Sequence, residues 1–126
     1  MQNTLKHLAF ILFLFTFSCK DDQPDREAPA LTTGDTFSIS GRGTVITGTV
    51  TSEGGYSLSE IGIVYGTSST PTVDDIKEKI DMAEVDKYPH EYSVTIRGGL
   101  PAGTIYYRAY AIGDGKAFYG ETKRKE

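Results

Sequence analysis

The chain contains no tryptophan, a single cysteine and two histidines, and these shortages exclude several kinds of chemistry. With one cysteine, a disulfide within the chain is impossible. After residue 18 the only histidine is His90, which lies between Pro89 and Glu91 at the start of an expected strand. Nucleophilic catalysis needs a serine or cysteine beside a positioned base, and nothing in the sequence pairs His90 with a serine. We therefore expect a protein that is not an enzyme and that uses no cofactor.

Positive charge is also scarce. The 13 lysines and arginines are outnumbered by 17 acidic residues, which gives a formal net charge of −4. Without residues 1–18, which contain only Lys6, the charge is −5. A nucleic-acid interface needs a basic stripe that neutralises phosphates, and no such stripe exists. We expect no nucleic-acid partner, and we expect Lys123-Arg124-Lys125 to be a solvated end of the chain.

Phenylalanine is scarce outside the first residues. Four of the six phenylalanines fall within the first 18 residues. The core of the folded part must therefore consist of valine, isoleucine, leucine and tyrosine, with Phe37 and Phe118 as the only phenylalanines.

Residues 1–18 have the composition of an export signal. Lys6 and His7 precede an apolar run that ends at Ser18. This run is too short for a helix across a bilayer of about 30 Å, which needs about 20 residues. A basic start followed by such a run is typical of a signal peptide.

Cys19 follows Ser18 directly, and this arrangement resembles the cleavage site of bacterial lipoproteins. The resemblance implies that Cys19 becomes a lipidated N-terminus and attaches the protein to a membrane. Lys20-Asp21-Asp22 comes next and resembles the export tag of surface lipoproteins of Bacteroidetes; the alternative is a plain soluble linker. Residues 19–35 lack a hydrophobic period and predict a flexible tether after the lipidated cysteine.

Short runs that favour β-structure follow at regular spacing, the pattern of an all-β sandwich. Side chains alternate across a strand, so each run predicts one inward face. The residues expected inside are Ile46, Gly48, Val50, Ile61, Ile63, Tyr65, Tyr92, Val94 and Ile96.

The clearest pattern lies between Leu100 and Gly120. Tyr107, Ala109 and Ala111 share one face of an expected strand, and Tyr106, Arg108 and Tyr110 share the other. Because Arg108 is charged, the second face is expected to be the wetter one. Asp114-Gly115 then predicts a hairpin turn, since glycine tolerates positive φ.

These segments together resemble the fibronectin type III-like domain common in Bacteroidetes lipoproteins. The resemblance covers residues 36–122 and rests on the order and spacing of Leu-Pro-Ala-Gly-Thr, Tyr-Tyr-Arg-Ala-Tyr-Ala and Gly-Asp-Gly. It implies an immunoglobulin-like or fibronectin type III-like sandwich of about seven strands over residues 36–126. The family usually has one more residue between Gly-Thr and Arg-Ala-Tyr-Ala, so the position of a tyrosine corner falls on Tyr106 or on Ile105, where the corner would be missing.

Residues 73–87 are rich in carboxylates, and two structures remain open for them. Asp74 could cap a helical turn, or the segment could be a loop with one short strand near Met82–Val85. The carboxylates match no calcium-loop spacing, and a solvated face is expected in place of a metal site or a carboxylate pair for glycoside hydrolysis.

The candidate binding face consists of Tyr106, Arg108 and Tyr110, because tyrosines favour protein interfaces and can stack on sugars. The alternative is that they cover the outer sheet and pair across strands. We expect a non-catalytic envelope protein, lipid-anchored in the outer membrane and facing the cell exterior, that acts as a binding or spacer module for a protein or glycan ligand. Two rival interpretations are a glycan-binding accessory protein of a carbohydrate uptake system and an assembly subunit that adds a strand to a neighbour.

Overall fold

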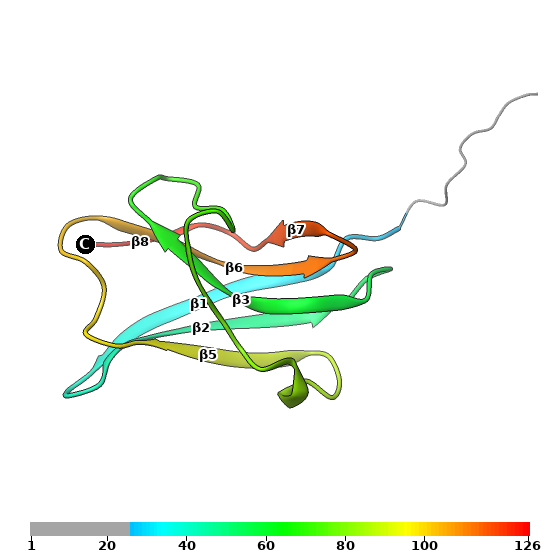
Figure 1. Ribbon diagram of the computed structural model, residues 1–126, viewed down its shortest axis with the longest axis horizontal. Helices are drawn as coiled ribbons and strands as arrows, with labels where there is room; N and C mark the ends of the chain where they lie inside the picture. Colours follow the sequence, from blue (N-terminus) through cyan, green and yellow to red (C-terminus); the bar gives the residue numbers. More distant parts are fainter. Residues whose placement is uncertain (1–25) are drawn as a thin grey trace, which may run out of the picture.

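Two antiparallel β-sheets packed face to face make up the part of the chain that the computed structural model describes, residues 26–126 (Figure 1). One sheet has the strand order β1–β2–β5. The other has the order β4–β3–β6–β7, with β8 also paired to β6. The strands are β1 (Ala30–Ile39), β2 (Gly43–Ser52), β3 (Leu58–Gly66), β4 (Ile76–Lys79), β5 (His90–Ile96), β6 (Ile105–Gly113), β7 (Lys116–Tyr119) and β8 (Lys123–Lys125).

This arrangement confirms the expected all-β sandwich, with eight strands where about seven were expected. The predicted signal peptide, Cys19 and Lys20-Asp21-Asp22 lie outside the described residues.

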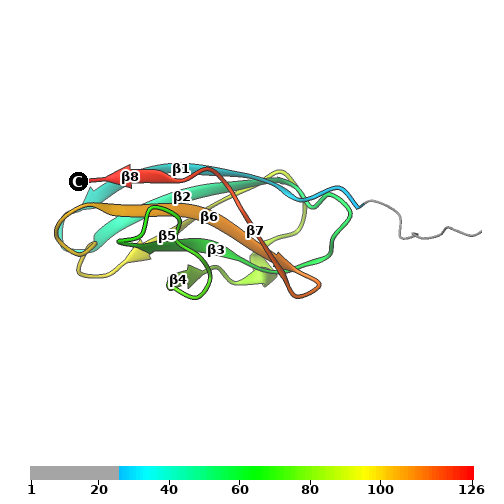
Figure 2. The ribbon, with the colours of Figure 1, turned by 90° about the horizontal axis from the view of Figure 1, so that it is seen from above.

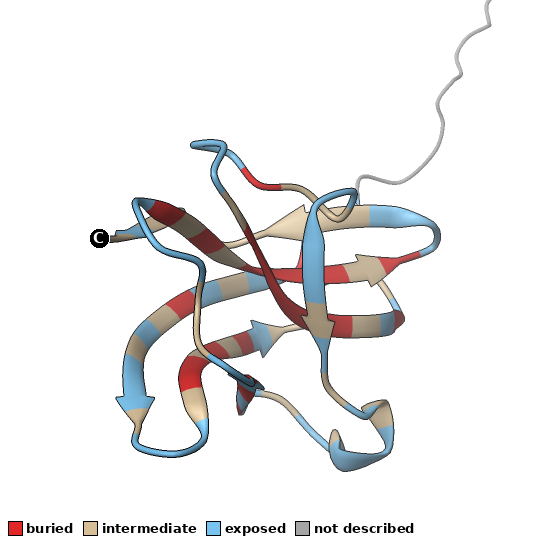
Figure 3. Ribbon diagram, turned by 60° about the vertical axis from the view of Figure 1, so that its left-hand side comes forward, coloured by how far each residue is buried: buried red, intermediate tan, exposed pale blue. Residues whose placement is uncertain are grey.

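The core lies between the sheets and consists of the inward side chains that the alternation predicted. Figure 3 shows these buried residues as red bands along the strands. They include Ile46 and Val50 of β2, Ile61 and Ile63 of β3, Val94 and Ile96 of β5, and Tyr107, Ala109 and Ala111 of β6. Each of the inward faces predicted for these strands is confirmed.

Phe37 does not contribute to the core and is 50% exposed. In the register of β1 and β2, Thr36 lies opposite the inward-facing Ile46, so Phe37 and its partner Val45 lie on the other face of the sheet. Phe118 is half-buried, and its ring packs 4.7 Å from the ring of Tyr56.

The folded part begins earlier than residue 36, and the prediction of a tether through residue 35 is wrong for its last part. Strand β1 begins at Ala30, and the Gly55 N–H donates a hydrogen bond of 2.8 Å to the carbonyl of Glu27. The threonine-rich sequence did not indicate the first part of this edge strand, residues 30–35. Thr33 is fully buried, and the Ala109 N–H donates a hydrogen bond of 2.9 Å to its Oγ1.

The C-terminal residues have a structure that the prediction of a solvated end did not include, since Lys123–Lys125 forms strand β8, although Arg124 is exposed and the two lysines are only half-buried. Strands β7 and β8 pair with successive parts of β6 and are separated by Gly120, Glu121 and Thr122. At this break the Thr33 N–H donates to the Glu121 carboxylate at 2.9 Å. Strand β1 therefore contacts the second sheet at the break between strands β7 and β8.

Residues 73–87 form a loop with one short strand, as one of the two expectations had it, but the strand lies at another position. The strand is β4, before Met82–Val85, and Met82–Glu84 forms a 3₁₀ turn whose N-cap is Asp81. The predicted hairpin turn at Asp114-Gly115 is confirmed, with positive φ at both residues. Within residues 26–126 the Tyr106 hydroxyl makes no hydrogen bond to the backbone, and Ile105 is 1% exposed, so the structure favours a missing tyrosine corner.

Candidate binding site

The predicted face of Tyr106, Arg108 and Tyr110 lies on the outer side of β6, but it is not an open surface. Tyr110 is fully buried, and Tyr106 and Arg108 are half-buried. The chain between β3 and β4 and strand β4 itself provide the contacts of Arg108 and Tyr110. The expectation of an exposed aromatic face is therefore wrong for Tyr110. A charged arginine on a strand does not ensure that the other side chains on the same face are exposed to solvent.

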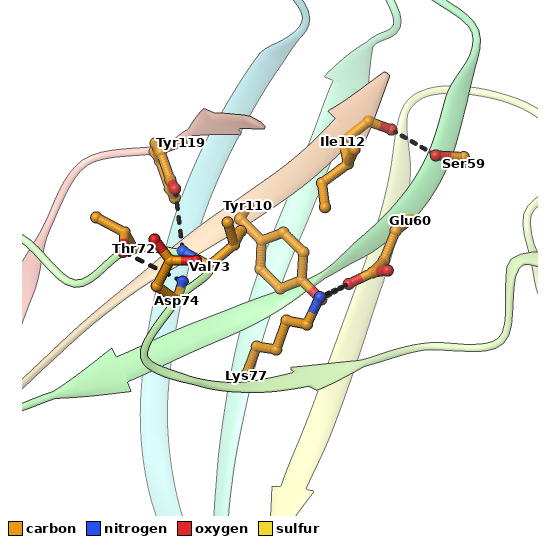
Figure 4. Close-up of polar contacts among 9 residues, drawn as sticks. All are labelled: Ser59, Glu60, Thr72, Val73, Asp74, Lys77, Tyr110, Ile112 and Tyr119. Atoms are coloured by element: carbon orange, nitrogen blue, oxygen red, sulfur yellow. Dashed lines mark hydrogen bonds and ion pairs between the residues drawn. The ribbon is translucent and has the colours of Figure 1, made fainter. Parts of the chain in front are cut away.

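Tyr110 belongs to a polar network with Glu60 and Lys77 (Figure 4). Its hydroxyl donates to the Glu60 carboxylate at 2.6 Å, and the Lys77 ammonium lies 2.8 Å from the same oxygen. Hydrogen bonds from Lys77 and then from Tyr110 lower the pKa of Glu60. Burial, followed by the bond to Glu60, raises the pKa of Tyr110.

Arg108 is engaged in a similar way. Its Nε donates to the Pro71 carbonyl at 2.7 Å, and its guanidinium carbon lies 3.7 Å from the centre of the Tyr119 ring. The Tyr119 hydroxyl in turn accepts the Val73 N–H at 3.0 Å (Figure 4). The bonds to Pro71 and Val73 hold the segment before β4 against the sheet. Arg108 and Tyr110 therefore stabilise the fold and are not available to a ligand without rearrangement.

A groove with a volume of about 820 Å³ lies elsewhere, between the β1–β2 turn and the segment that follows β5. We call it the distal groove. Its charged lining residues are Arg42 and Arg97, and its lining contains no aspartate or glutamate. Its hydroxyl-bearing lining residues are Ser38, Ser40, Thr44 and Thr95. Charge and hydroxyl groups thus define its chemistry.

Gly43 brings the two walls of the distal groove together. Its φ is +118°, and a Cβ at this position would lie 2.0 Å from the Ile96 carbonyl oxygen. Only glycine permits this close approach. Since Arg42 precedes Gly43 and Arg97 follows Ile96, the contact places both arginines at one groove.

The sequence prediction missed both arginines. The available signal was their setting, because Arg42 lies between two glycines and Arg97 precedes two glycines at a strand end. The glycines in such loops have no side chains, so the backbone is exposed and the arginine side chain projects without long neighbours beside it.

The carboxylates of residues 74–86 act locally. Asp75 accepts the Thr72 N–H at 2.8 Å, and Asp81 accepts the Ala83 N–H at 3.0 Å. Within the described residues no group of three or more His, Cys, Asp or Glu side chains is placed to hold a metal ion. His90 is half-buried at the start of β5, and its ring stacks on that of Tyr92.

Among residues 26–126 no helix is long and apolar enough to cross a membrane. Comparisons of the chain with protein-family models, with curated proteins and with solved structures found no match.

Proposed function

We propose that the protein is a non-catalytic binding module, anchored in the outer membrane by a lipid on Cys19, that presents the distal groove to a ligand outside the cell. The observation that supports this proposal is the separation between the start of the sandwich and the groove. The first described residues lie at one end of the molecule, and the β1–β2 turn and the β5–β6 segment lie at the other (Figures 1 and 2).

Contacts at the first end fix the direction in which the chain joins the sandwich. Arg26 forms an ion pair with Asp114 in the β6–β7 turn, and its guanidinium carbon lies 4.2 Å from the centre of the Tyr56 ring. Strand β1 then runs 10 residues to the groove. At about 3.3 Å per residue this strand spans roughly 33 Å. A lipid before residue 26 would therefore attach the sandwich by the end opposite the groove.

The alternative of a strand-adding assembly subunit meets obstacles at two of the edge strands. At the ten-residue edge strand β1, the Thr33 N–H is already bonded to the Glu121 carboxylate. Strand β4, at the edge of its sheet, has only four residues and carries Lys77 and Lys79. Short edge strands with lysines resist pairing with another chain. The groove, in contrast, has the size of a ligand site.

The proposal is tested by metabolic lipid labelling and by protease shaving of intact cells, with the wild type compared with Cys19→Ala. We expect the wild type to take up the lipid label and to be cleaved from the outside. Cys19→Ala should lose the label. As a control for cell integrity, a periplasmic protein must survive the protease.

Two results would contradict the proposal. If the wild type took up no label, Cys19 would carry no lipid and the proposed anchor would be wrong. A labelled but protected wild type would place the domain on the periplasmic side, and Lys20-Asp21-Asp22 would then be only linker.

A further inference from the structure

We propose that the distal groove binds an acidic glycan, meaning a sugar chain that carries carboxylate or sulfate groups. This inference rests on the proposed function, since that function places the groove outside the cell, and it names the ligand class. The anionic groups would lie against Arg42 and Arg97, and the sugar hydroxyls against the rest of the lining.

The charge of the groove is opposite to that of the protein. Acidic residues outnumber basic ones in the chain, yet the groove contains two arginines and no carboxylate. The ion pairs formed within residues 26–126 involve other cations, namely Arg26, Lys77, Lys123 and Arg124. Arg42 and Arg97 are exposed, and no ion pair within residues 26–126 uses their guanidinium groups, so these donors face a ligand. A guanidinium matches a carboxylate or sulfate because it donates two parallel hydrogen bonds.

The smaller neighbouring pocket does not reverse this balance. It shares Ser38, Thr44 and Gly99 with the groove and adds Lys125 and Glu126. The Glu126 carboxylate is 2.6 Å from the Arg124 guanidinium, so its charge is already paired.

The rest of the lining favours a polyhydroxylated ligand over a peptide. Apart from Ile39 the groove is lined by arginine, serine, threonine and glycine. A Cβ built at Gly41 or Gly98 would meet nothing within 4 Å, so the peptide groups there are uncovered. Most modes of peptide recognition use apolar or aromatic pockets, which this groove lacks; an acidic peptide bound by arginines alone is the exception, and a polyglutamate probe tests it. The absence of an aromatic side chain also removes stacking with neutral sugars, so recognition must depend on charge.

The volume of about 820 Å³ is larger than a single sulfate or phosphate ion needs. It falls within the range of small-molecule sites, roughly 300–1,000 Å³. A short segment of a sugar chain fits this range.

The test measures binding of fluorescent oligogalacturonate, of a sulfated dextran oligomer and of a neutral maltooligosaccharide of similar length to the full chain, purified in detergent micelles whether or not it carries a lipid. We expect one or both acidic probes to bind, with affinity that falls as salt rises, and the neutral probe not to bind. Arg42→Gln combined with Arg97→Gln should weaken binding by roughly tenfold or more. The matched control is Lys87→Gln with Lys116→Gln, which removes the same charge from exposed sites elsewhere and should leave binding unchanged.

Three results would overturn the inference. The first is that neither acidic probe binds. The second is that both double variants weaken binding equally. The third is that polyglutamate binds more tightly than either acidic glycan, a result that would assign the groove to acidic peptides. Thermal unfolding of each variant checks that it is folded, and Arg42→Lys with Arg97→Lys keeps the charge without the paired donors. Because the assay is done in solution, a failed lipid-labelling experiment would remove the anchor without affecting this result.

Discussion

Tyr92 joins the two sheets through a single hydroxyl group. It lies on β5, and its hydroxyl donates to the Gly62 carbonyl of β3 at 2.8 Å inside the core. Its ring lies over Gly48 on the neighbouring strand, where a Cβ would come within 2.7 Å of the ring. Burial raises the pKa of Tyr92, so the hydroxyl stays protonated and remains a donor.

Tyr92→Phe should lower the free energy of unfolding by about 1 kcal/mol, because the ring still packs but a buried hydrogen bond is lost. Urea denaturation measures this change. Tyr106→Phe is the control, since that tyrosine is half-buried and makes no such bond among the described residues, and it should change stability by less than about 0.5 kcal/mol. Equal effects from the two variants would show that the bond to Gly62 contributes nothing.

Glu60 makes stability depend on pH. Its pKa in the folded protein is held below the usual value of 4.5 by hydrogen bonds from Lys77 and Tyr110. A group with a lowered folded-state pKa stabilises the fold above its unfolded pKa and loses that contribution as the pH falls through the folded-state value. The wild type should therefore lose about 1 kcal/mol from this site between about pH 5 and pH 3, a modest value because the pair is partly exposed.

Glu60→Gln should flatten this part of the stability profile, measured by urea denaturation across the pH range. Lys77→Gln should flatten it in part, since Lys77 provides the largest contribution to the shift. If both variants kept the wild-type profile, the pH dependence would have to arise at other groups, such as Glu121, whose pKa is lowered by the Thr33 N–H.

At the scale of elements, the β1–β2 turn determines the distal groove. Gly43 and Gly41 both have positive φ, +118° and +80°, but their surroundings differ. A Cβ at Gly43 would collide with the Ile96 carbonyl, whereas a Cβ at Gly41 would point into open space. The two glycines form a matched pair in one turn.

Gly43→Ala should lower the free energy of unfolding by about 2–4 kcal/mol, because backbone strain is combined with a steric clash. Gly41→Ala should lower it by only about 1 kcal/mol, from strain alone. Thermal or urea unfolding of both variants measures the difference. A similar loss in the two variants would mean that the turn does not need its contact with Ile96.

The strands that the sequence predicted are those whose signals are local. Alternation identified β2, β3, β5 and β6, and Asp114-Gly115 identified the hairpin turn. Residues 30–35 of strand β1 and the whole of strand β8 escaped prediction because the bonds that fix them are distant in sequence: Thr33 bonds to Ala109, and Lys123–Lys125 pairs with Ile105–Tyr107. Judged by composition alone, such segments are predicted to be linkers, because composition does not show which distant residues pair with them.

The candidate site was harder to predict for the same reason. The sequence indicates which residues of β6 share a face, and Tyr106, Arg108 and Tyr110 do share one. It does not indicate that the segment around Pro71 folds over that face, which the Arg108 bond to the Pro71 carbonyl shows. The distal groove needs the turn at Gly43 to meet the end of β5, and no local pattern contains that contact.

At the scale of the whole molecule, the sandwich separates the end at which the described chain begins from the distal groove. The acidic residues of the described part are concentrated between Asp74 and Glu91, and the distal groove has none. An acidic ligand is therefore attracted at one end of the molecule and repelled along the segment that contains β4. Such a distribution orients a charged ligand as it approaches.

The orientation on the membrane can be measured with one label on the lipidated chain, because a lipid on Cys19 leaves no other thiol. Ser40→Cys places a fluorophore at the distal groove, and Lys116→Cys places one beside the β6–β7 turn. Residues 19–25 reach at most about 25 Å when extended, and β1 adds roughly 33 Å beyond them. Energy transfer to a dye in the vesicle surface should be lower from residue 40 than from residue 116. Equal transfer would mean that the sandwich lies flat, and higher transfer from residue 40 would mean that the groove faces the lipid, which contradicts the proposed presentation to an outside ligand.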